Sequence, residues 1–397
     1  MTQNKVKKNV LYFQSGGPTA VINSSFMGLY HEVRKHQSLN LLVSPYGISG
    51  LINNELHPVS KGEVPLLSFR PGAYWGSLRQ KLPEDPSDPL VKQIVENLKS
   101  NNISYIFPNG GNDSMDTTYK LSKYIAANQL DIKVIGIPKT IDDDLPFTDH
   151  TPGFGSAAKY VANAVIAISL DDKSYKKGKI NVVEVMGRDS GFLTASAVLA
   201  GLRGQRPDYI YVPEVPFDIE DFRKKAEQTF EKKGRCLVVV SEGIRDKDGN
   251  LIAATGKMDA FGNKLMGGVA SYLSSLVSQD GYKTRSIELS VVQRAASFCP
   301  SYIDIHEAEM CGAQALKFAL KGITNAMVSL QREPGEVYHI RYEPVSLNDV
   351  DGKIVTLPER YINAEKDNIL DSYLDYVSPL VRGNPNPFDE DGLLKLF

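Results

Sequence analysis

Short apolar runs alternate with longer amphipathic stretches through about the first 240 residues of the chain. Seven runs are typical of buried strands, at residues 9–14, 40–44, 104–107, 133–137, 180–186, 208–212 and 236–241. Helical spacing of apolar positions marks the stretches 20–36, 89–100, 114–128 and 155–170. Strands that alternate with helices in this way indicate βαβ units and parallel sheets.

The alternation restarts near Ile180, which predicts an α/β protein of two doubly wound, Rossmann-like lobes with mostly parallel sheets and a cleft between them. Turn residues at 248–250 and 262–263 predict an inserted hairpin or loop within 243–284, which also holds a helix near 267–278. After about residue 335 the chain becomes more polar and aromatic, and we interpret 336–397 as an extension packed on the lobes. The predicted lobes are residues 1–155 with about 290–335, and residues 156–289.

Composition and charge limit the classes of partner that the chain can bind. The chain has 397 residues with 42% hydrophobic composition, enough for one or two full cores. Its formal net charge is -2, so no overall positive field attracts nucleic acid or an anionic membrane. No apolar run approaches the roughly 18 to 20 residues that span a bilayer. Three widely spaced cysteines match no zinc pattern. We therefore expect a cytoplasmic protein with no nucleic-acid or membrane partner.

Two acidic loops directly follow apolar runs. GGNDS at 110–114 comes after the run at 104–107, and PKTIDDD at 138–144 comes after the run at 133–137. Open α/β sheets bind their ligands at the carboxyl ends of the strands. A lysine beside several carboxylates suits a polyanionic substrate that needs a metal, a counter-charge and a general base. The loops therefore predict a phosphoryl-transfer site.

A third turn, SGGPTA at 15–20, leaves two interpretations open. It follows the first strand and opens a helix, so its backbone N–H groups and the helix dipole could hold a phosphate. Paired glycines are equally expected where a turn only needs positive φ. The turn lacks the G-x-G-x-x-G pattern that a dinucleotide-binding oxidoreductase would need, which argues against that class.

The segment PKTIDDD at 138–144 indicates a particular enzyme family. With Thr148, Thr151 and the GFGS run at 153–156, it resembles the catalytic loop of the phosphofructokinases, specifically their pyrophosphate-dependent branch. The resemblance extends from residue 9 to about 320. It includes the sugar-phosphate motifs MGR at 186–188, EG at 242–243, Arg285 and QR at 293–294, and GAYWGSLR at 72–79 on the phosphate-donor side. The implied activity is reversible phosphoryl transfer from pyrophosphate to the 1-hydroxyl of fructose 6-phosphate, in glycolysis and gluconeogenesis.

The resemblance also implies roles for single residues. Asp142 is the general base and Asp144 supports it, in a catalytic set that also contains Lys139 and Asp113. The pyrophosphate is bound by Gly17, Arg79, Lys139 and Asp113, in the lobe of residues 1–155, with Mg²⁺ as cofactor beside Asn112. The sugar phosphate is bound by Thr140, Ile141, Asp142, Met186, Gly187, Arg188, Glu242, Arg294, Arg285 and Lys179. Because residues at the last two positions reach a neighbouring subunit's site in bacterial relatives, a homodimer or homotetramer is implied.

Donor choice depends on Asp113 and Lys139, because ATP-using members resemble this loop but carry glycine at both positions. A carboxylate about 4 Å from the α-phosphate of ATP would cost roughly 4 kcal/mol at an effective dielectric near 20, on the order of a thousandfold in affinity.

Two alternatives stay open: an ATP-dependent 6-phosphofructokinase, and a catalytically silent regulatory subunit that binds sugar phosphate. Departures from the family pattern keep the second open, with Asn112 in place of aspartate and Val291 in place of histidine or tyrosine. Lys179 stands where arginine is common. Arginine can bind a phosphate through two parallel hydrogen bonds, whereas lysine offers a single point charge.

Overall fold

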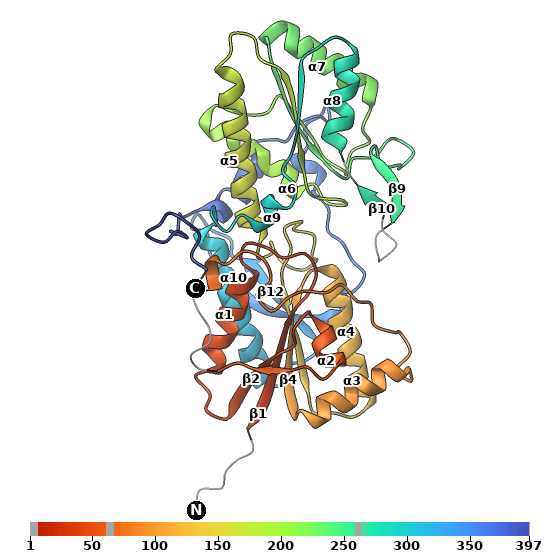
Figure 1. The fold of residues 1–397 in the computed structure, drawn as a ribbon, viewed down its shortest axis with the longest axis vertical. Coiled ribbons are helices and arrows are strands. Elements are labelled where there is room, and N and C mark those ends of the chain that lie inside the picture. The colour runs from red at the N-terminus through yellow and green to blue at the C-terminus, as the bar shows by residue number, and fades with distance from the viewer. Residues whose placement is uncertain (1–6, 61–66, 259–263, 267, 397) are drawn as a thin grey trace, which may run out of the picture.

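The computed structural model describes residues 7–60, 67–258, 264–266 and 268–396, which form two α/β lobes stacked along the long axis (Figure 1). The predicted turn at 262–263 lies outside the described residues. The strands are β1 (Lys8–Gln14), β2 (Leu39–Val43), β3 (His57–Pro58), β4 (Ile103–Gly110), β5 (Lys133–Pro138), β6 (Ile180–Val185), β7 (Tyr209–Tyr211), β8 (Cys236–Ser241), β9 (Ala254–Met258), β10 (Lys264–Met266), β11 (Thr284–Glu288), β12 (Ala326–Arg332) and β13 (Ile340–Ser346).

The helices begin and end close to the predicted ranges where a range was predicted. The α-helices are α1 (Ile22–Val33), α2 (Ile48–Ile52), α3 (Pro89–Ser100), α4 (Asn112–Ala127), α5 (Phe154–Lys173), α6 (Phe192–Ala195), α7 (Ile219–Lys233), α8 (Val269–Gln279), α9 (Val292–Ala295), α10 (Tyr302–Leu320), α11 (Leu347–Val350) and α12 (Ser372–Val377). Short 3₁₀ segments are η1 (Leu67–Phe69), η2 (Ser196–Arg203), η3 (Glu359–Tyr361) and η4 (Pro379–Val381). Local signals set several ends: Asp88 caps α3 by accepting from the Leu90 N–H at 2.8 Å, and proline occupies the first turn.

The first lobe is built on a seven-stranded sheet in the order β13-β12-β5-β4-β1-β2-β3. Its central strands are parallel, and only β3 and β13 at the edges are antiparallel to their neighbours. Alternate residues of β1 face opposite layers: Val10 and Tyr12 pack with α1 and α10, whereas Leu11 and Phe13 pack with α3 and α4. Burial on both faces explains why the strands read as continuous apolar runs.

The second lobe repeats this architecture on a smaller scale. Its four strands run parallel in the order β11-β6-β8-β7. One face packs on α5, and the other packs on α7 and α8. The prediction of two doubly wound lobes with mostly parallel sheets, with a restart near Ile180, is therefore confirmed. The exact lobe boundaries stay a prediction.

The C-terminal part of the chain is not only an extension packed on the lobes, because it supplies a strand of the large sheet. β13 pairs with β12 along its whole length and forms the edge of the large sheet, so residues 340–346 are integral to the first lobe. The chain then touches both lobes. The Val355 N–H donates to the Asp144 carbonyl at 2.9 Å in one lobe, and the Tyr373 hydroxyl donates to the Phe192 carbonyl at 2.7 Å in the other. Figure 1 places the C-terminus beside the junction of the lobes.

Candidate active site

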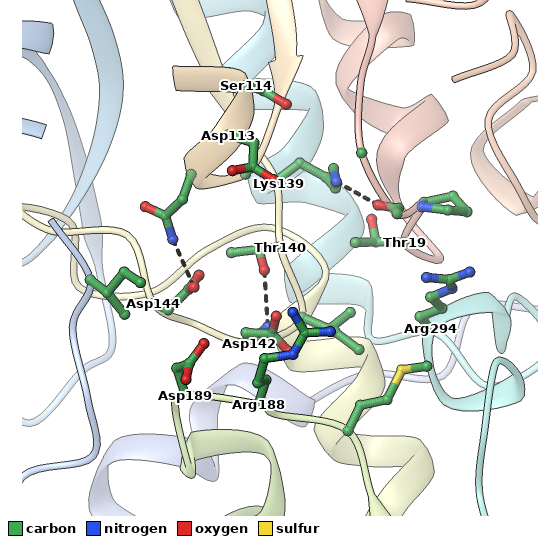
Figure 2. Close-up of a pocket in the computed structure, with 18 of the residues that line it drawn as sticks. Thr19, Asp113, Ser114, Lys139, Thr140, Asp142, Asp144, Arg188, Asp189 and Arg294 are labelled. Carbon is green, nitrogen blue, oxygen red and sulfur yellow. Dashed lines mark hydrogen bonds between the residues drawn. The ribbon is translucent and has the colours of Figure 1, made fainter. Parts of the chain in front are cut away.

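A cavity of about 420 Å³ lies where the carboxyl ends of strands from both sheets face each other. β4 and β5 end at Gly110 and Pro138 in the large sheet, and β6 and β8 end at Val185 and Ser241 in the small one. The cavity is lined by Gly16, Gly17, Pro18, Thr19, Arg79, Gly111, Asn112, Asp113, Ser114, Lys139, Thr140, Ile141, Asp142, Asp144, Met186, Arg188, Asp189, Glu242, Arg294 and Ile354. In Figure 2, Asp113 and Lys139 lie on one side of the cavity, Arg188 and Asp189 on the other, and Asp142 between them.

Cations gather around the glycine turn that follows β1. Lys139 Nζ donates a hydrogen bond to the Gly17 carbonyl. A Cβ at Gly17 would lie 2.8 Å from Nη1 of Arg294 and 4.0 Å from Nη2 of Arg79. The turn sits beside β4 at the point where the sheet order reverses, and Gly16 within it has a φ of 76°, which glycine adopts without strain. Three cations around one turn can bind an anion.

Lys139 is the most deeply buried of these cations, with 3% of its surface exposed. Burial, helped by the positive charge of Arg79, lowers its pKa from 10.5 to about 8, while Asp142 opposes the shift. A bound polyanion would favour the charged lysine. The environment therefore suits a substrate that carries several negative charges.

The catalytic loop predicted from PKTIDDD presents two carboxylates to the cavity. The Asp142 N–H donates to Thr140 Oγ1 at 3.1 Å, and Ser190 Oγ donates to the Asp142 carbonyl at 3.0 Å. Burial raises the pKa of Asp142, and Lys139 counteracts part of that effect. A raised pKa brings a carboxylate closer to the working pH of a general base.

Asp144 stands on the other side of the same loop. Its Oδ2 accepts from Asn112 Nδ2 at 2.7 Å, whereas its buried Oδ1 has no hydrogen-bond partner among the described residues. Burial and the nearby charge of Asp142 raise the pKa of Asp144 to about 8. Two neighbouring like charges in a partly desolvated site favour a shared proton or an added cation, and the unpartnered oxygen marks where such a partner can bind.

Polar groups of the small lobe form the opposite end of the cavity. The Gly187 N–H donates to Glu242 Oε1 at 3.3 Å, and the Met186 N–H donates to Gln293 Oε1 at 3.1 Å. Burial raises the pKa of Glu242 to about 7. Arg188 Nε is buried without a hydrogen-bond partner in the described part of the chain. These groups can bind hydroxyl and phosphate oxygens.

Most of the residues that the sequence singled out meet in this cavity. Thirteen of them line it: Gly17, Arg79, Asn112, Asp113, Lys139, Thr140, Ile141, Asp142, Asp144, Met186, Arg188, Glu242 and Arg294. Gly187 does not line the cavity but holds Glu242 through its backbone. Lys179 and Arg285 are not brought to it, because they lie at the amino ends of β6 and β11, and Arg285 pairs with Asp171 at 2.8 Å. Val291 is 52% exposed and does not line the cavity either.

Sequence reasoning missed several lining residues. Asp189 directly follows the MGR motif and pairs with Arg245 at 2.7 Å, so its position after a strand end was an available signal. Thr19 and Ser114 belong to the two glycine turns already identified. Ile354 enters from the segment after β13 with 52% of its surface exposed, and nothing in the local sequence marks it.

Comparisons with known proteins identify relatives of the chain. Residues 9–319 match the family model described as phosphofructokinase. Curated proteins named pyrophosphate–fructose 6-phosphate 1-phosphotransferase are similar to the chain: that of Halomonas elongata is 36% identical over 98% of this chain and 95% of its own length. The one from Xanthomonas campestris pv. campestris is 37% identical over the same shares, 98% and 95%. A solved pyrophosphate-dependent phosphofructokinase from Nitrosospira multiformis superposes with a TM-score of 0.88 at 33% identity, covering 98% of this chain and 96% of that chain.

Proposed function

This chain belongs to the phosphofructokinase family, and we propose that it transfers a phosphoryl group reversibly from pyrophosphate to the 1-hydroxyl of fructose 6-phosphate. The products are fructose 1,6-bisphosphate and phosphate. One observation carries the proposal: the cation cluster around Gly17 and the carboxylate of Asp142 belong to one cavity between the two sheets. Donor and acceptor can therefore be held on either side of the base.

Pyrophosphate is held by Lys139 and Arg79 around the Gly17 turn. Arg294, which the resemblance assigns to the sugar phosphate, lies close enough to this turn to contact the donor as well. Asp113 lies in the first turn of α4 and lines the same end of the cavity, where its negative charge would face the α-phosphate of a nucleotide. The ATP-dependent alternative is disfavoured for this reason. The positive charge of Lys139 binds the pyrophosphate directly.

Asp142 accepts the proton of the 1-hydroxyl as that oxygen attacks the donor phosphorus. General-base help of this kind contributes typically about 10² to 10⁴-fold, and most of the remaining rate enhancement comes from positioning and fixed charge. The sugar phosphate is bound by Thr140 of the catalytic loop and by Met186, Arg188 and Glu242 at the small-lobe end. A catalytically silent subunit would not need Asp142, Asp144 and Lys139 in one cavity.

Mg²⁺ is the proposed cofactor, and the residues present fit it. Asp144 offers its unpartnered Oδ1 as a hard oxygen ligand. Asn112 offers its amide oxygen, because its amide nitrogen already donates a hydrogen bond to Asp144. The described residues contain no group of three or more His, Cys, Asp or Glu side chains able to hold a metal on their own. Mg²⁺ commonly takes its other ligands from water and substrate phosphates, and bound there it would neutralise charge on the transferred group.

A homodimer or homotetramer is supported by the positions of Lys179 and Arg285. Both lie away from this chain's own cavity, so their proposed sugar-phosphate contacts require a second copy. Exposed apolar side chains occur nearby in sequence, at Leu170 and Tyr175 on and after α5, with 51% and 57% of their surface exposed. An interface between copies would cover them.

We also propose a cytoplasmic location. Cys236, Cys299 and Cys311 are all free thiols, as expected in a reducing compartment. No described helix is long and apolar enough to cross a membrane.

The proposed function is tested by fructose 1,6-bisphosphate formation from fructose 6-phosphate, pyrophosphate and Mg²⁺. The wild-type chain should form the product, and Asp142→Asn should lower kcat by roughly 10² to 10⁴-fold while fructose 6-phosphate still binds. Asp189→Asn is the matched control, a carboxylate in the same cavity that is paired with Arg245. No product from the wild type, or equal losses in the two variants, would contradict the proposal.

A further inference from the structure

Asp143, between the two catalytic carboxylates, is held by contacts that the proposed mechanism does not use. Its φ is 58°, in the left-handed region that Asp, Asn and Gly adopt more easily than other residues. Its side chain is 4% exposed and does not line the cavity. The left-handed turn at this position sets how the chain leaves Asp142 and enters Asp144.

Two residues hold the carboxylate of Asp143. The Thr151 N–H donates to Oδ1 at 2.9 Å, with Thr151 Oγ1 at 3.3 Å from the same oxygen. The Tyr376 hydroxyl donates to Oδ2 and also lies 3.0 Å from the Asp149 carbonyl. Thr151 also ties the start of the loop, because its Oγ1 donates to the Thr140 carbonyl at 2.9 Å. Tyr376 comes from α12, far along the chain and outside residues 9–319 that match the family model.

Tyr376 is itself fixed by its surroundings. Its ring packs against Phe192 and Tyr373, with centroid separations of 5.7 and 5.5 Å, and the Arg332 guanidinium lies 5.0 Å from its centroid. The C-terminal segment contacts the loop a second time, where the Val355 N–H binds the Asp144 carbonyl at 2.9 Å. The hydroxyl of Tyr376 therefore reaches Asp143 from a packed aromatic cluster, and this leaves the ring little freedom to move.

We propose that Tyr376 is a positioning residue for phosphoryl transfer, which fixes Asp143 and through it the turn that aims Asp142 into the cavity. This inference rests on the proposed function and adds to it that the C-terminal segment is required for turnover. Tyr376 touches neither substrate directly, since it does not line the cavity. Its effect must therefore appear in kcat and leave the binding of both substrates nearly unchanged.

Tyr376→Phe tests the proposal, because it keeps the ring and removes only the hydroxyl. Misplacement of a reacting group by about 1 Å can cost on the order of 10²-fold, so kcat should fall roughly 10- to 100-fold. The KM values for fructose 6-phosphate and pyrophosphate should stay near wild type. Tyr373→Phe is the matched control: it lies on the same helix, in the same cluster, and loses a buried hydrogen bond to the Phe192 carbonyl. Its kcat should be unchanged.

A double-mutant cycle separates positioning from general stability. Asp143→Gly keeps the left-handed turn but removes the carboxylate together with its Thr151 and Tyr376 contacts, so its kcat should fall at least as far as in Tyr376→Phe. Combining the two substitutions should add no further loss. Asp143→Asn keeps both the turn and hydrogen-bonding capacity and should retain more activity than Asp143→Gly. Thermal unfolding of each variant measures its stability separately from its kcat.

The outcomes distinguish this inference from the function on which it rests. An active wild type with an unaffected Tyr376→Phe variant, or with equal kcat losses in Tyr376→Phe and Tyr373→Phe, would overturn the positioning role alone. Additive losses in the double variant would also overturn it. A wild type that forms no fructose 1,6-bisphosphate would overturn the proposed function and this inference together.

Discussion

Replacing Lys139 by methionine removes one buried positive charge and keeps most of the side-chain volume. Lys139 Nζ lies at the Gly17 carbonyl, among the guanidinium groups of Arg79 and Arg294, and the residue is 3% exposed. Solvent therefore screens its charge little. The substitution tests whether this lysine supplies the donor affinity that the cavity geometry suggests.

The size of the effect follows from Coulomb's law. At about 4 Å and an effective dielectric near 20, one charge pair between lysine and pyrophosphate is worth roughly 4 kcal/mol. That corresponds to a loss on the order of a thousandfold in kcat/KM for pyrophosphate. Arg79 and Arg294 remain, so binding is weakened without being abolished. The KM for fructose 6-phosphate should change far less, because the sugar is held at the opposite end of the cavity.

Steady-state kinetics with each substrate varied in turn measures both values. Lys120→Met is the matched control, because Lys120 is also a buried lysine of the first lobe, 7% exposed, but is paired with Glu84 and Asp116 outside the cavity. It should leave kcat/KM for pyrophosphate unchanged. The reasoning is refuted if Lys139→Met keeps wild-type kcat/KM for pyrophosphate, or if both lysine variants lose activity equally.

Three further predictions concern donor choice, pH and stability. Asp113→Gly should raise kcat/KM with ATP by removing a carboxylate from the path of the α-phosphate; an unchanged ATP rate would show that this residue does not exclude nucleotides. The KM for pyrophosphate should rise as pH passes about 8, because Lys139 has a folded-state pKa of about 8 instead of 10.5 and loses its proton there; a KM constant across that range would contradict this. His150 lies buried between Glu307 and Asp149 at 2.7 and 2.9 Å; burial alone would lower its pKa, but these carboxylates outweigh that effect and raise the pKa to about 10. His150→Phe should lower the free energy of unfolding in urea by roughly 3–5 kcal/mol at neutral pH. In the wild type, the contribution of His150 to the free energy of unfolding is complete below its ordinary pKa of 6.5 and is lost as pH rises through about 10. Equal free energies of unfolding for variant and wild type at neutral pH would contradict this prediction.

The sequence predicted seven strands up to residue 241, because these buried strands appear as continuous apolar runs. It did not predict β12, although most of that strand is buried, because Ser329 and Gln331 interrupt its apolar run. It did not predict β13, whose residues are mostly partly exposed at an edge, so its apolar run is broken. α10 was also missed. Its buried positions contact α1, α5 and β5 on several sides, so they do not form one clear stripe.

Site residues were predictable where a motif directly follows a strand. Asp142, Lys139 and Met186 all belong to such motifs, and the parallel sheet brings strand ends together. Ile354 and Tyr376 were not predictable, because their positions depend on the path of the C-terminal segment between the lobes. The close approach of Arg294 to Gly17 likewise joins residues far apart in the chain, so the sequence could not predict it. The folded turn has features of both interpretations, with Gly16 at a φ of 76° and cations near Gly17.

The most direct test of the account compares two phosphoryl donors with the wild-type chain. Fructose 1,6-bisphosphate formation is measured with Mg²⁺ and fructose 6-phosphate, and kcat/KM is determined for pyrophosphate and for ATP. The charges of Asp113 and Lys139 predict that pyrophosphate is preferred on the order of a thousandfold. Comparable or higher kcat/KM with ATP would contradict the assignment of these two residues and of the donor.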